Sequence, residues 1–234
     1  MASSQASYAS RIAKAEQLFQ HINSFTNYNP GVPELTPTNL KALITGLSDT
    51  QEQHTLKHHD YAESARERRE IFTTNRDSIS KRLTLANSYI RARKGVDSQQ
   101  YIDVNKLIQK IKSTRSVKVT INASEETISR SERSYGSQLQ NFTDIIALLK
   151  RYGTDYQPAN TIIDVPTFLT LQEAATTLNN KVTLNYGAYK PKITERQNGF
   201  KTLSETATRI KQMVKAQYGS DSTEYNLVKA LRFH

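Results

Sequence analysis

One group of side chains in this sequence has the composition of a metal site: His54, His58, His59 and Asp60. His54 and His58 are four residues apart, so on a helix both would lie on one face, where they could share a zinc ion. Zinc needs one or two further ligands, and the second half of the chain has no corresponding histidines. An exposed polar helix face is the alternative explanation, and on balance we predict no metal site.

A second group of candidate residues is basic. Residues 105–123 hold five Lys and Arg residues and no acidic residue: Lys106, Lys110, Lys112, Arg115 and Lys118. These side chains could contact an anionic partner, such as nucleic acid or an acidic protein, by Coulomb attraction. The alternative is a solvated linker. Within this segment Val117, Val119 and Ile121 alternate with polar residues, which predicts one short strand that would have to pair with this chain or with a neighbouring subunit.

Other patterns that carry chemistry are absent from the sequence. There is no Walker A loop, no glycine-rich dinucleotide fingerprint and no Gly-x-Ser-x-Gly elbow. The chain has no cysteine, which excludes disulfides, thiol catalysis and cysteine-ligated zinc. Glu63, Glu67 and Glu70 alternate with arginines at three- and four-residue spacing, as on a solvated helix. We therefore predict that the protein is not an enzyme and uses no cofactor.

The composition predicts long amphipathic helices and a basic surface. Of 234 residues, 36% are hydrophobic and only 8 are glycine, and the formal net charge is +10. Such a charge favours anionic partners, although lysines and arginines spread over solvated helix faces would give the same total. The first residues lack the basic and apolar regions of a signal peptide, and no apolar run reaches the length of a membrane span. We expect a cytoplasmic protein, with unconventional export left open.

The two halves of the chain resemble each other over most of their length. Matching pairs recur in the same order with offsets of 127 to 129, among them Tyr8 and Tyr135, Pro37 and Pro166, Leu40 and Leu169, Tyr61 and Tyr189, Arg68 and Arg196, and Phe72 and Phe200. In the closing segments the offset becomes 124, and Gly95, Asp97, Ser98 and Tyr101 match Gly219, Asp221, Ser222 and Tyr225. An ordered series of this kind is the signature of an internal duplication.

Each half predicts three helical segments. The first covers about 5–24 and 125–152, and the second runs from Pro37, with Thr36 as its N-cap, to about residue 72. The third covers about 76–94 and 202–218, and each copy ends at a glycine. Asp97 and Asp221 would then cap a short final helix, while Pro191 predicts a kink or a register change in the second copy.

These segments predict an all-α fold: an elongated helical bundle made of two homologous three-helix units. Residues 1–104 would form the first repeat, 105–123 the basic linker with its one short strand, and 124–234 the second repeat. Short connections favour antiparallel neighbours within each unit. Whether the two repeats pack as one bundle or as two is left open.

The closing segment of the chain also carries a resemblance. It reads Val214-Lys215-Ala216-Gln217-Tyr218-Gly219, followed by Asp221-Ser222 and Tyr225. This segment resembles the C-terminal motif of a group of duplicated helical proteins associated with Bacteroidota, for which no function is known to us. The resemblance implies a duplicated helical fold and a bacterial origin, and implies no activity.

Three functions remain after the sequence has been considered. The first is a non-enzymatic structural or scaffold protein that forms a homo-oligomer or larger assembly through helical surfaces and its 12 tyrosines. The second is a nucleic-acid-binding accessory protein that uses the basic linker and helix faces. The third is an enzyme or ligand carrier with a site between helices. We expect the first, and keep the second as the alternative.

Overall fold

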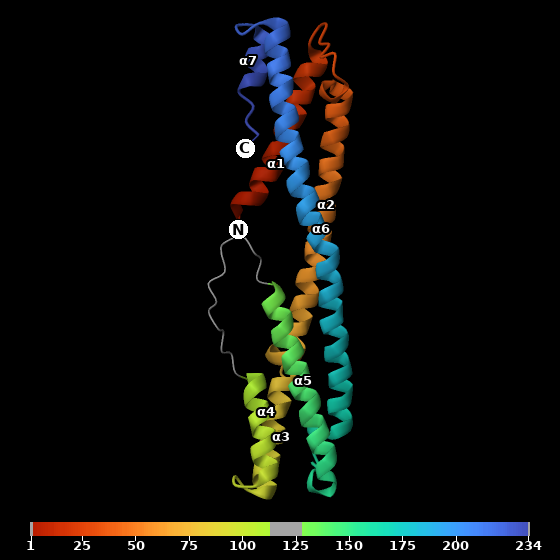
Figure 1. The fold of residues 1–234 in the computed structure, drawn as a ribbon, viewed down its shortest axis with the longest axis vertical. Coiled ribbons are helices and arrows are strands. Elements are labelled where there is room, and N and C mark those ends of the chain that lie inside the picture. The colour runs from red at the N-terminus through yellow and green to blue at the C-terminus, as the bar shows by residue number, and fades with distance from the viewer. Residues whose placement is uncertain (1, 113–127, 234) are drawn as a thin grey trace. The chain divides into compact units, whose positions relative to one another are not determined.

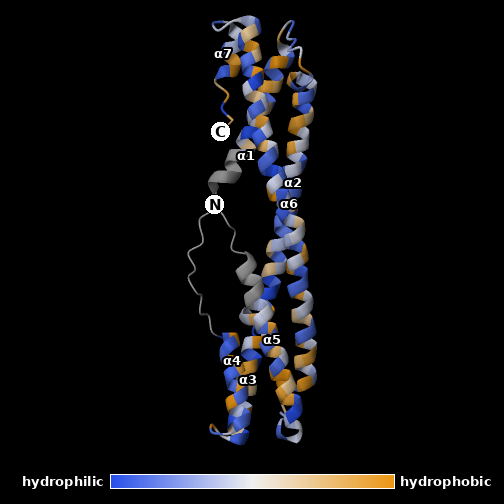
Figure 2. Ribbon diagram, in the orientation of Figure 1, coloured by the Kyte–Doolittle hydropathy of each residue, from blue (hydrophilic) through white to orange (hydrophobic). Residues whose placement is uncertain are grey.

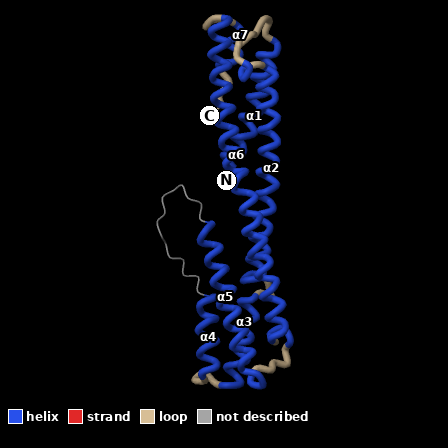
Figure 3. Tube along the Cα trace, turned by 45° about the vertical axis from the view of Figure 1, so that its right-hand side comes forward, coloured by secondary structure: helices blue, strands red, loops and turns tan. Residues whose placement is uncertain are grey.

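Every regular element of the structure is helical. A computed structural model describes residues 2–112 and 128–233, and these residues contain helices and connecting turns but no strand (Figure 3). The predicted all-α fold class is therefore confirmed. The short strand expected at residues 117–121 lies outside the described residues.

Seven α-helices are present in the described residues (Figure 1). They are α1 (Ala2–Ser24), α2 (Pro37–Arg69), α3 (Ile79–Lys94), α4 (Gln99–Lys112), α5 (Ile128–Tyr152), α6 (Val165–Tyr218) and α7 (Thr223–Lys229). Four short turns join them: three 3₁₀ turns, η1 (Pro33–Leu35), η3 (Gly153–Asp155) and η4 (Thr161–Ile163), and one π turn, η2 (Glu70–Thr74). Among the described helices, none combines the length and the apolar character needed to cross a membrane.

The long helix of the second half is continuous where the sequence predicts two helices. α6 runs for 54 residues and includes both Pro191 and the expected third helix at 202–218. Proline removes one backbone hydrogen bond, but in α6 it does not end the helix. The first half is interrupted instead, because the π turn η2 and the bend after it separate α2 from α3.

The two glycines that follow α3 and α6 end these helices as predicted. Gly95 has φ +87° and Gly219 has φ +98°, which a residue with a Cβ rarely adopts. The predicted aspartate caps are replaced by the serines one residue later. The Ser98 hydroxyl accepts the backbone N–H of Tyr101 at 3.3 Å, and the Ser222 hydroxyl accepts that of Tyr225 at 3.0 Å.

Part of the expected linker is a packed helix. α4 continues to Lys112, so residues 105–112 are helical, and Ile108 and Ile111 are buried. They follow Val104 at the three- and four-residue spacing of one helix face. The remaining linker residues, 113–123, lie outside the described part of the chain.

The chain divides into two compact units, and each takes pieces from both halves of the sequence. Unit 1 comprises residues 1–59 and 187–234, and unit 2 comprises residues 60–186. Each unit has its own buried core of hydrophobic side chains. The helices carry both hydrophobic and hydrophilic residues along their length (Figure 2), as amphipathic helices do.

The two cores draw on corresponding kinds of element. Large side chains buried in unit 1 come mainly from α1, α2 and α6 and include Leu18, Ile22, Leu40, Ile44, Phe200, Leu203 and Ile210. Those of unit 2 come from η2, α3, α4, α5 and α6 and are Phe72, Ile79, Leu83, Ile108, Phe142, Ile145 and Phe168. A first helix and the start of a long helix from one half thus pack with later helices from the other half.

Candidate functional site

His54 is a buried polar side chain in the core region of unit 1. It lies on α2 with 4% of its surface exposed. Its Nδ1 is 3.1 Å from the Arg196 Nη1 atom, and its Nε2 is 3.3 Å from the Tyr189 hydroxyl. A guanidinium has only donors, so Nδ1 must accept and the ring proton must lie on Nε2, where it is donated to Tyr189. The geometry therefore requires a neutral imidazole.

The surroundings of His54 also oppose its protonation. Burial, followed by the charges of Arg196 and His58, lowers the pKa of His54 from its ordinary 6.5 to about 4. The His58 ring is parallel to the His54 ring within 3°, with 6.4 Å between centroids. The Tyr189 ring contacts both histidines, at 5.2 and 5.3 Å.

This arrangement does not direct the histidines at a common ion. The rings stack instead of converging, and the Nδ1 lone pair of His54 already accepts a hydrogen bond from Arg196. His59 is exposed, and the Asp60 backbone oxygen accepts the side-chain amide of Asn185 in unit 2. Within residues 2–112 and 128–233, no three His, Asp or Glu side chains gather as metal ligands would.

Each unit contains a contact between a tyrosine, an arginine and a phenylalanine, which we call the Tyr–Arg–Phe contact. Its members are Tyr8, Arg196 and Phe200 in unit 1, and Tyr135, Arg68 and Phe72 in unit 2. The two rings are 4.6 Å apart in unit 1 and 4.9 Å apart in unit 2. The guanidinium lies 4.6 Å from the tyrosine ring in unit 1 and 4.2 Å in unit 2, within cation–π range.

The groups around the Tyr–Arg–Phe contact differ between the units. In unit 2, Arg68 donates to the Asn179 side-chain oxygen at 3.1 Å, whereas in unit 1 Arg196 faces His54. Unit 1 adds Arg11, which donates to the Phe200 carbonyl and to the Ser204 hydroxyl, each at 2.6 Å. The six members of the contact were all matched pairs in the sequence, but their assembly across the two halves was not foreseen.

A tyrosine in each unit closes the loop before the long helix. Tyr28 donates to the Leu35 carbonyl at 3.1 Å, and Tyr156 donates to the Ile163 carbonyl at 2.5 Å. Burial raises the pKa of Tyr28 to about 12 and raises that of Tyr156 further. Both phenols are therefore uncharged structural donors near neutral pH.

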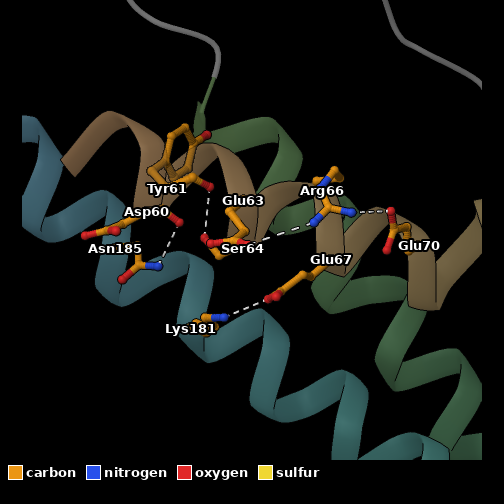
Figure 4. A network of polar contacts seen from close by, with 9 residues as sticks. All are labelled: Asp60, Tyr61, Glu63, Ser64, Arg66, Glu67, Glu70, Lys181 and Asn185. Atoms are coloured by element: carbon orange, nitrogen blue, oxygen red, sulfur yellow. Dashed lines mark hydrogen bonds and ion pairs between the residues drawn. The ribbon is translucent and has the colours of Figure 1, made fainter. Parts of the chain in front are cut away.

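The predicted charge alternation on α2 forms ion pairs on the surface of unit 2 (Figure 4). Arg66 of α2 pairs with Glu70 of η2 at 2.7 Å, and Glu67 of α2 pairs with Lys181 of α6 at 2.7 Å. Glu63 is 4.0 Å from Arg66. These carboxylates are each engaged by a cation, as expected for a solvated helix and not for an acid–base pair.

Three of the predicted basic residues lie on α4, and two of them, Lys106 and Lys110, are on the side away from its buried stripe. Lys106 and Lys110 are exposed, and Lys112 donates to the Thr84 hydroxyl of α3 at 2.7 Å. Arg115 and Lys118 lie outside the described residues. The predicted contact residues were all in the expected linker. None was in α3, although cations of α3 lie beside α4.

Together α3 and α4 form a strongly basic part of the described chain. Residues 79–112 hold eight Lys and Arg and two Asp, a formal net charge of +6. Residues 203–234, the last helical part of unit 1, hold five basic and three acidic residues, a formal net charge of +2. The sequence does contain this information, because the net charge of each segment can be counted once the helix boundaries are known.

Comparison with known protein families, with curated proteins and with solved structures finds no match for this chain. The resemblance of the closing segment to the Bacteroidota group therefore stays a prediction. The function has to be argued from the contacts described above.

Proposed function

We propose that this protein is a non-enzymatic structural or scaffold protein that associates with further copies of itself. The observation that supports the proposal is that the ionisable side chains with strongly shifted pKa values make structural hydrogen bonds. His54, Tyr28 and Tyr156 have the most strongly shifted pKa values, and each is hydrogen-bonded inside its unit. Catalytic groups with shifted pKa values usually face a cleft, whereas these three hold helices and loops together.

The surface offered to another copy is aliphatic and not tyrosine-rich. Nine tyrosines pack on the two cores, and Tyr61, Tyr186 and Tyr189 contact other rings within their own unit. Several aliphatic side chains are exposed instead: Leu56, Leu85, Val96, Ile162, Leu169, Leu184 and Leu227. Leu184 on α6 is the most exposed of them, at 73%. Covering such a side chain contributes about 1.5–3 kcal/mol.

Sedimentation velocity at two protein concentrations tests the proposal. We expect a mass above the 26.5 kDa of one chain, with a larger share of assembled material at the higher concentration. Leu184→Gln should reduce assembly more than Leu85→Gln on α3 does, because Leu184 is 73% exposed and Leu85 is 47% exposed. A monomer at both concentrations would contradict self-association, and equal behaviour of both variants would contradict the role of Leu184.

We also propose that the chain arose by duplication of one helical unit. Support comes from contacts that recur at matched positions. The Tyr–Arg–Phe contact and the tyrosine-to-carbonyl bond before the long helix occur once in each unit. The α3-to-α4 and α6-to-α7 connections use the same glycine and the same serine cap.

Superposing residues 8–104 on residues 135–228, element by element in a crystal structure, would test the duplication. We expect α1 to correspond to α5, α2 with α3 to correspond to α6, and α4 to correspond to α7. Equivalent residues should share burial, as Leu18 and Ile145 do. Unrelated burial at the matched positions would contradict common ancestry of the halves.

A second candidate function is an accessory protein that binds nucleic acid. The specific observation in its favour is the formal net charge of +6 on residues 79–112. Phosphate contacts by lysine and arginine supply most of non-specific nucleic-acid binding. Fluorescence anisotropy with a short DNA duplex at low salt tests this candidate, and absence of binding there would exclude it.

A further inference from the structure

We infer that the outer face of the α3–α4 pair is a binding surface for the phosphate backbone of nucleic acid, read without regard to base sequence. We call it the basic face, and its members are Lys81 and Arg91 on α3 and Lys106, Lys110 and Lys112 on α4. The inference rests on the second candidate function and names the surface that would carry it.

The helices hold these cations on one fixed framework. Asn87 of α3 donates to Asn105 of α4 at 3.1 Å, and Lys112 reaches Thr84 at 2.7 Å. The residue numbers rise along one helix as they fall along the other, so the pair is antiparallel. The end of α4 therefore lies beside the beginning of α3, which places Lys112 and Lys81 at the same end of the face.

The buried stripe of α4 directs its lysines outward. Val104, Ile108 and Ile111 lie in the core of unit 2, with 0–5% of their surfaces exposed. Lys106 and Lys110 are four residues apart on the opposite side and are exposed. Lys81 and Arg91, which are exposed on α3, are ten residues or about 15 Å apart along the helix.

Asp155 pairs with Lys94 at 2.6 Å, but neighbouring hydrogen bonds to neutral acceptors leave the charge of other cations in this hairpin uncompensated. Arg82 donates to the backbone carbonyls of Asp77 and Ile162, and Arg93 donates to that of Thr154. Lys112 likewise donates to a neutral hydroxyl. Neutral acceptors satisfy the donors without cancelling the charge, so the field of these cations persists toward solvent over about one Debye length.

The same packing argues against a membrane surface as the partner. An amphipathic helix binds a bilayer by inserting its apolar face, and the apolar face of α4 is occupied by the core of unit 2. Nucleic acid requires only cations spread over a rigid surface, because its phosphates repeat at regular short intervals. A basic face without an available apolar stripe therefore fits a nucleic-acid backbone better.

The test measures binding of the full chain to a DNA duplex of about 20 base pairs by fluorescence anisotropy over a range of NaCl concentrations. Lys106→Gln combined with Lys110→Gln removes two charges from the basic face. The slope of log affinity against log salt is negative, and each lost phosphate contact reduces its magnitude by about 0.9. The double variant should therefore have a slope that is smaller in magnitude by about 1.8. Affinity at about 0.1 M salt should fall at least tenfold.

The matched control is Lys215→Gln combined with Lys229→Gln, which removes the same charge from exposed positions in the corresponding segment of unit 1. This control should keep the wild-type slope, as should Lys106→Arg with Lys110→Arg, which keeps the charge. Circular dichroism checks that every variant is folded. Equal losses in the two charge-removing doubles would overturn the basic face while leaving nucleic-acid binding in place.

Two further probes decide the class of partner. Vesicles containing an anionic phospholipid and the polypeptide poly-glutamate are titrated under the same conditions. Tighter binding to either probe than to the duplex would overturn the assignment to nucleic acid. No binding to the duplex at low salt would overturn both the basic face and the second candidate function.

Discussion

Units 1 and 2 hold their helices together with the same Tyr–Arg–Phe contact but support its arginine with different acceptors. In unit 2 the acceptor is the side-chain oxygen of Asn179, and in unit 1 it is the Nδ1 atom of His54. An amide has the same charge at every ordinary pH. An imidazole loses its acceptor when it takes up a proton.

This difference shows that the same Tyr–Arg–Phe contact can be either insensitive or sensitive to acid, depending on the residue beside its arginine. The ring–ring and ring–guanidinium distances agree within 0.5 Å between the units, so the frame itself is unchanged. What varies is the neighbouring side chain that accepts a hydrogen bond from the Nη1 atom of the arginine. A buried arginine needs such an acceptor, because an unsatisfied buried donor costs about 1–3 kcal/mol.

The largest expected effect comes from removing the phenylalanine of the contact. Phe72 and Phe200 are both buried, so Phe72→Ala and Phe200→Ala should each lower the free energy of unfolding by about 3–5 kcal/mol. We expect Phe72→Ala to weaken amide protection in unit 2 and Phe200→Ala to weaken it in unit 1. Hydrogen exchange followed peptide by peptide measures both.

Leu85→Ala supplies the control for this pair, because Leu85 is exposed on α3 and its truncation should cost less than about 0.5 kcal/mol. If each phenylalanine variant lost protection equally in both units, the cores would not be separate and the comparison would fail.

The second effect is a pH dependence confined to unit 1. The pKa of His54 is about 4 in the fold and near its ordinary 6.5 in the unfolded chain, so the unfolded state binds more protons between these values. The contribution of His54 to stability is complete above pH 6.5 and is lost as the pH falls toward 4. We expect a loss of about 1–3 kcal/mol, measured as weaker amide protection in unit 1 after correction for intrinsic exchange rates.

His54→Gln isolates this term, because the glutamine oxygen can still accept from Arg196 but does not titrate. The variant should lose less stability than the wild-type chain between pH 6.5 and 4.5. A variant with the same acid response as the wild-type chain would show that other groups cause it.

The sequence predicted the helices and most of their ends, because apolar spacing, prolines and glycines are local signals. It predicted the cap residues less well. Both Asp97 and Ser98 suit an N-cap, and the structure uses the serine. It also aligned Leu40 with Leu169, whereas the buried residue one turn into α6 is Phe168. A one-residue error rotates a helix by about 100° and exchanges buried for exposed positions.

The division into units could not be predicted from the sequence. The spacing of an apolar stripe shows that a helix packs on one face, but it does not show whether the partner helix comes from the same half of the chain or from the other half. The sequence suggested sequential repeats, and the compact units combine residues 1–59 with 187–234. Of the basic face, the sequence predicted Lys106, Lys110 and Lys112 but not the cations of α3. It assigned residues 105–112 to a linker although Val104, Ile108 and Ile111 have helical spacing.

A smaller difference is expected between the two tyrosines that close the loops. Tyr156→Phe leaves the Ile163 carbonyl without its donor in a buried position, and should cost about 1–2 kcal/mol. Tyr28→Phe removes a longer bond at a half-buried position and should cost about 0.5–1 kcal/mol. Urea unfolding of both variants measures the difference, and a larger loss for Tyr28→Phe would contradict the burial argument.

The smallest effect concerns a helical glycine in each unit. A Cβ added at Gly136 in α5 meets no atom within 4 Å, so Gly136→Ala should raise the free energy of unfolding by about 0.5–1 kcal/mol through helix propensity. A Cβ added at Gly199 in α6 would lie 2.5 Å from Leu47 Cδ2, and Leu47 is buried in the core of unit 1. Moving that side chain costs about as much as the helix gains, so Gly199→Ala should be neutral or destabilising. Thermal unfolding of the two variants measures their order, and an equal gain from both would show that α6 and α2 are not closely packed at this point.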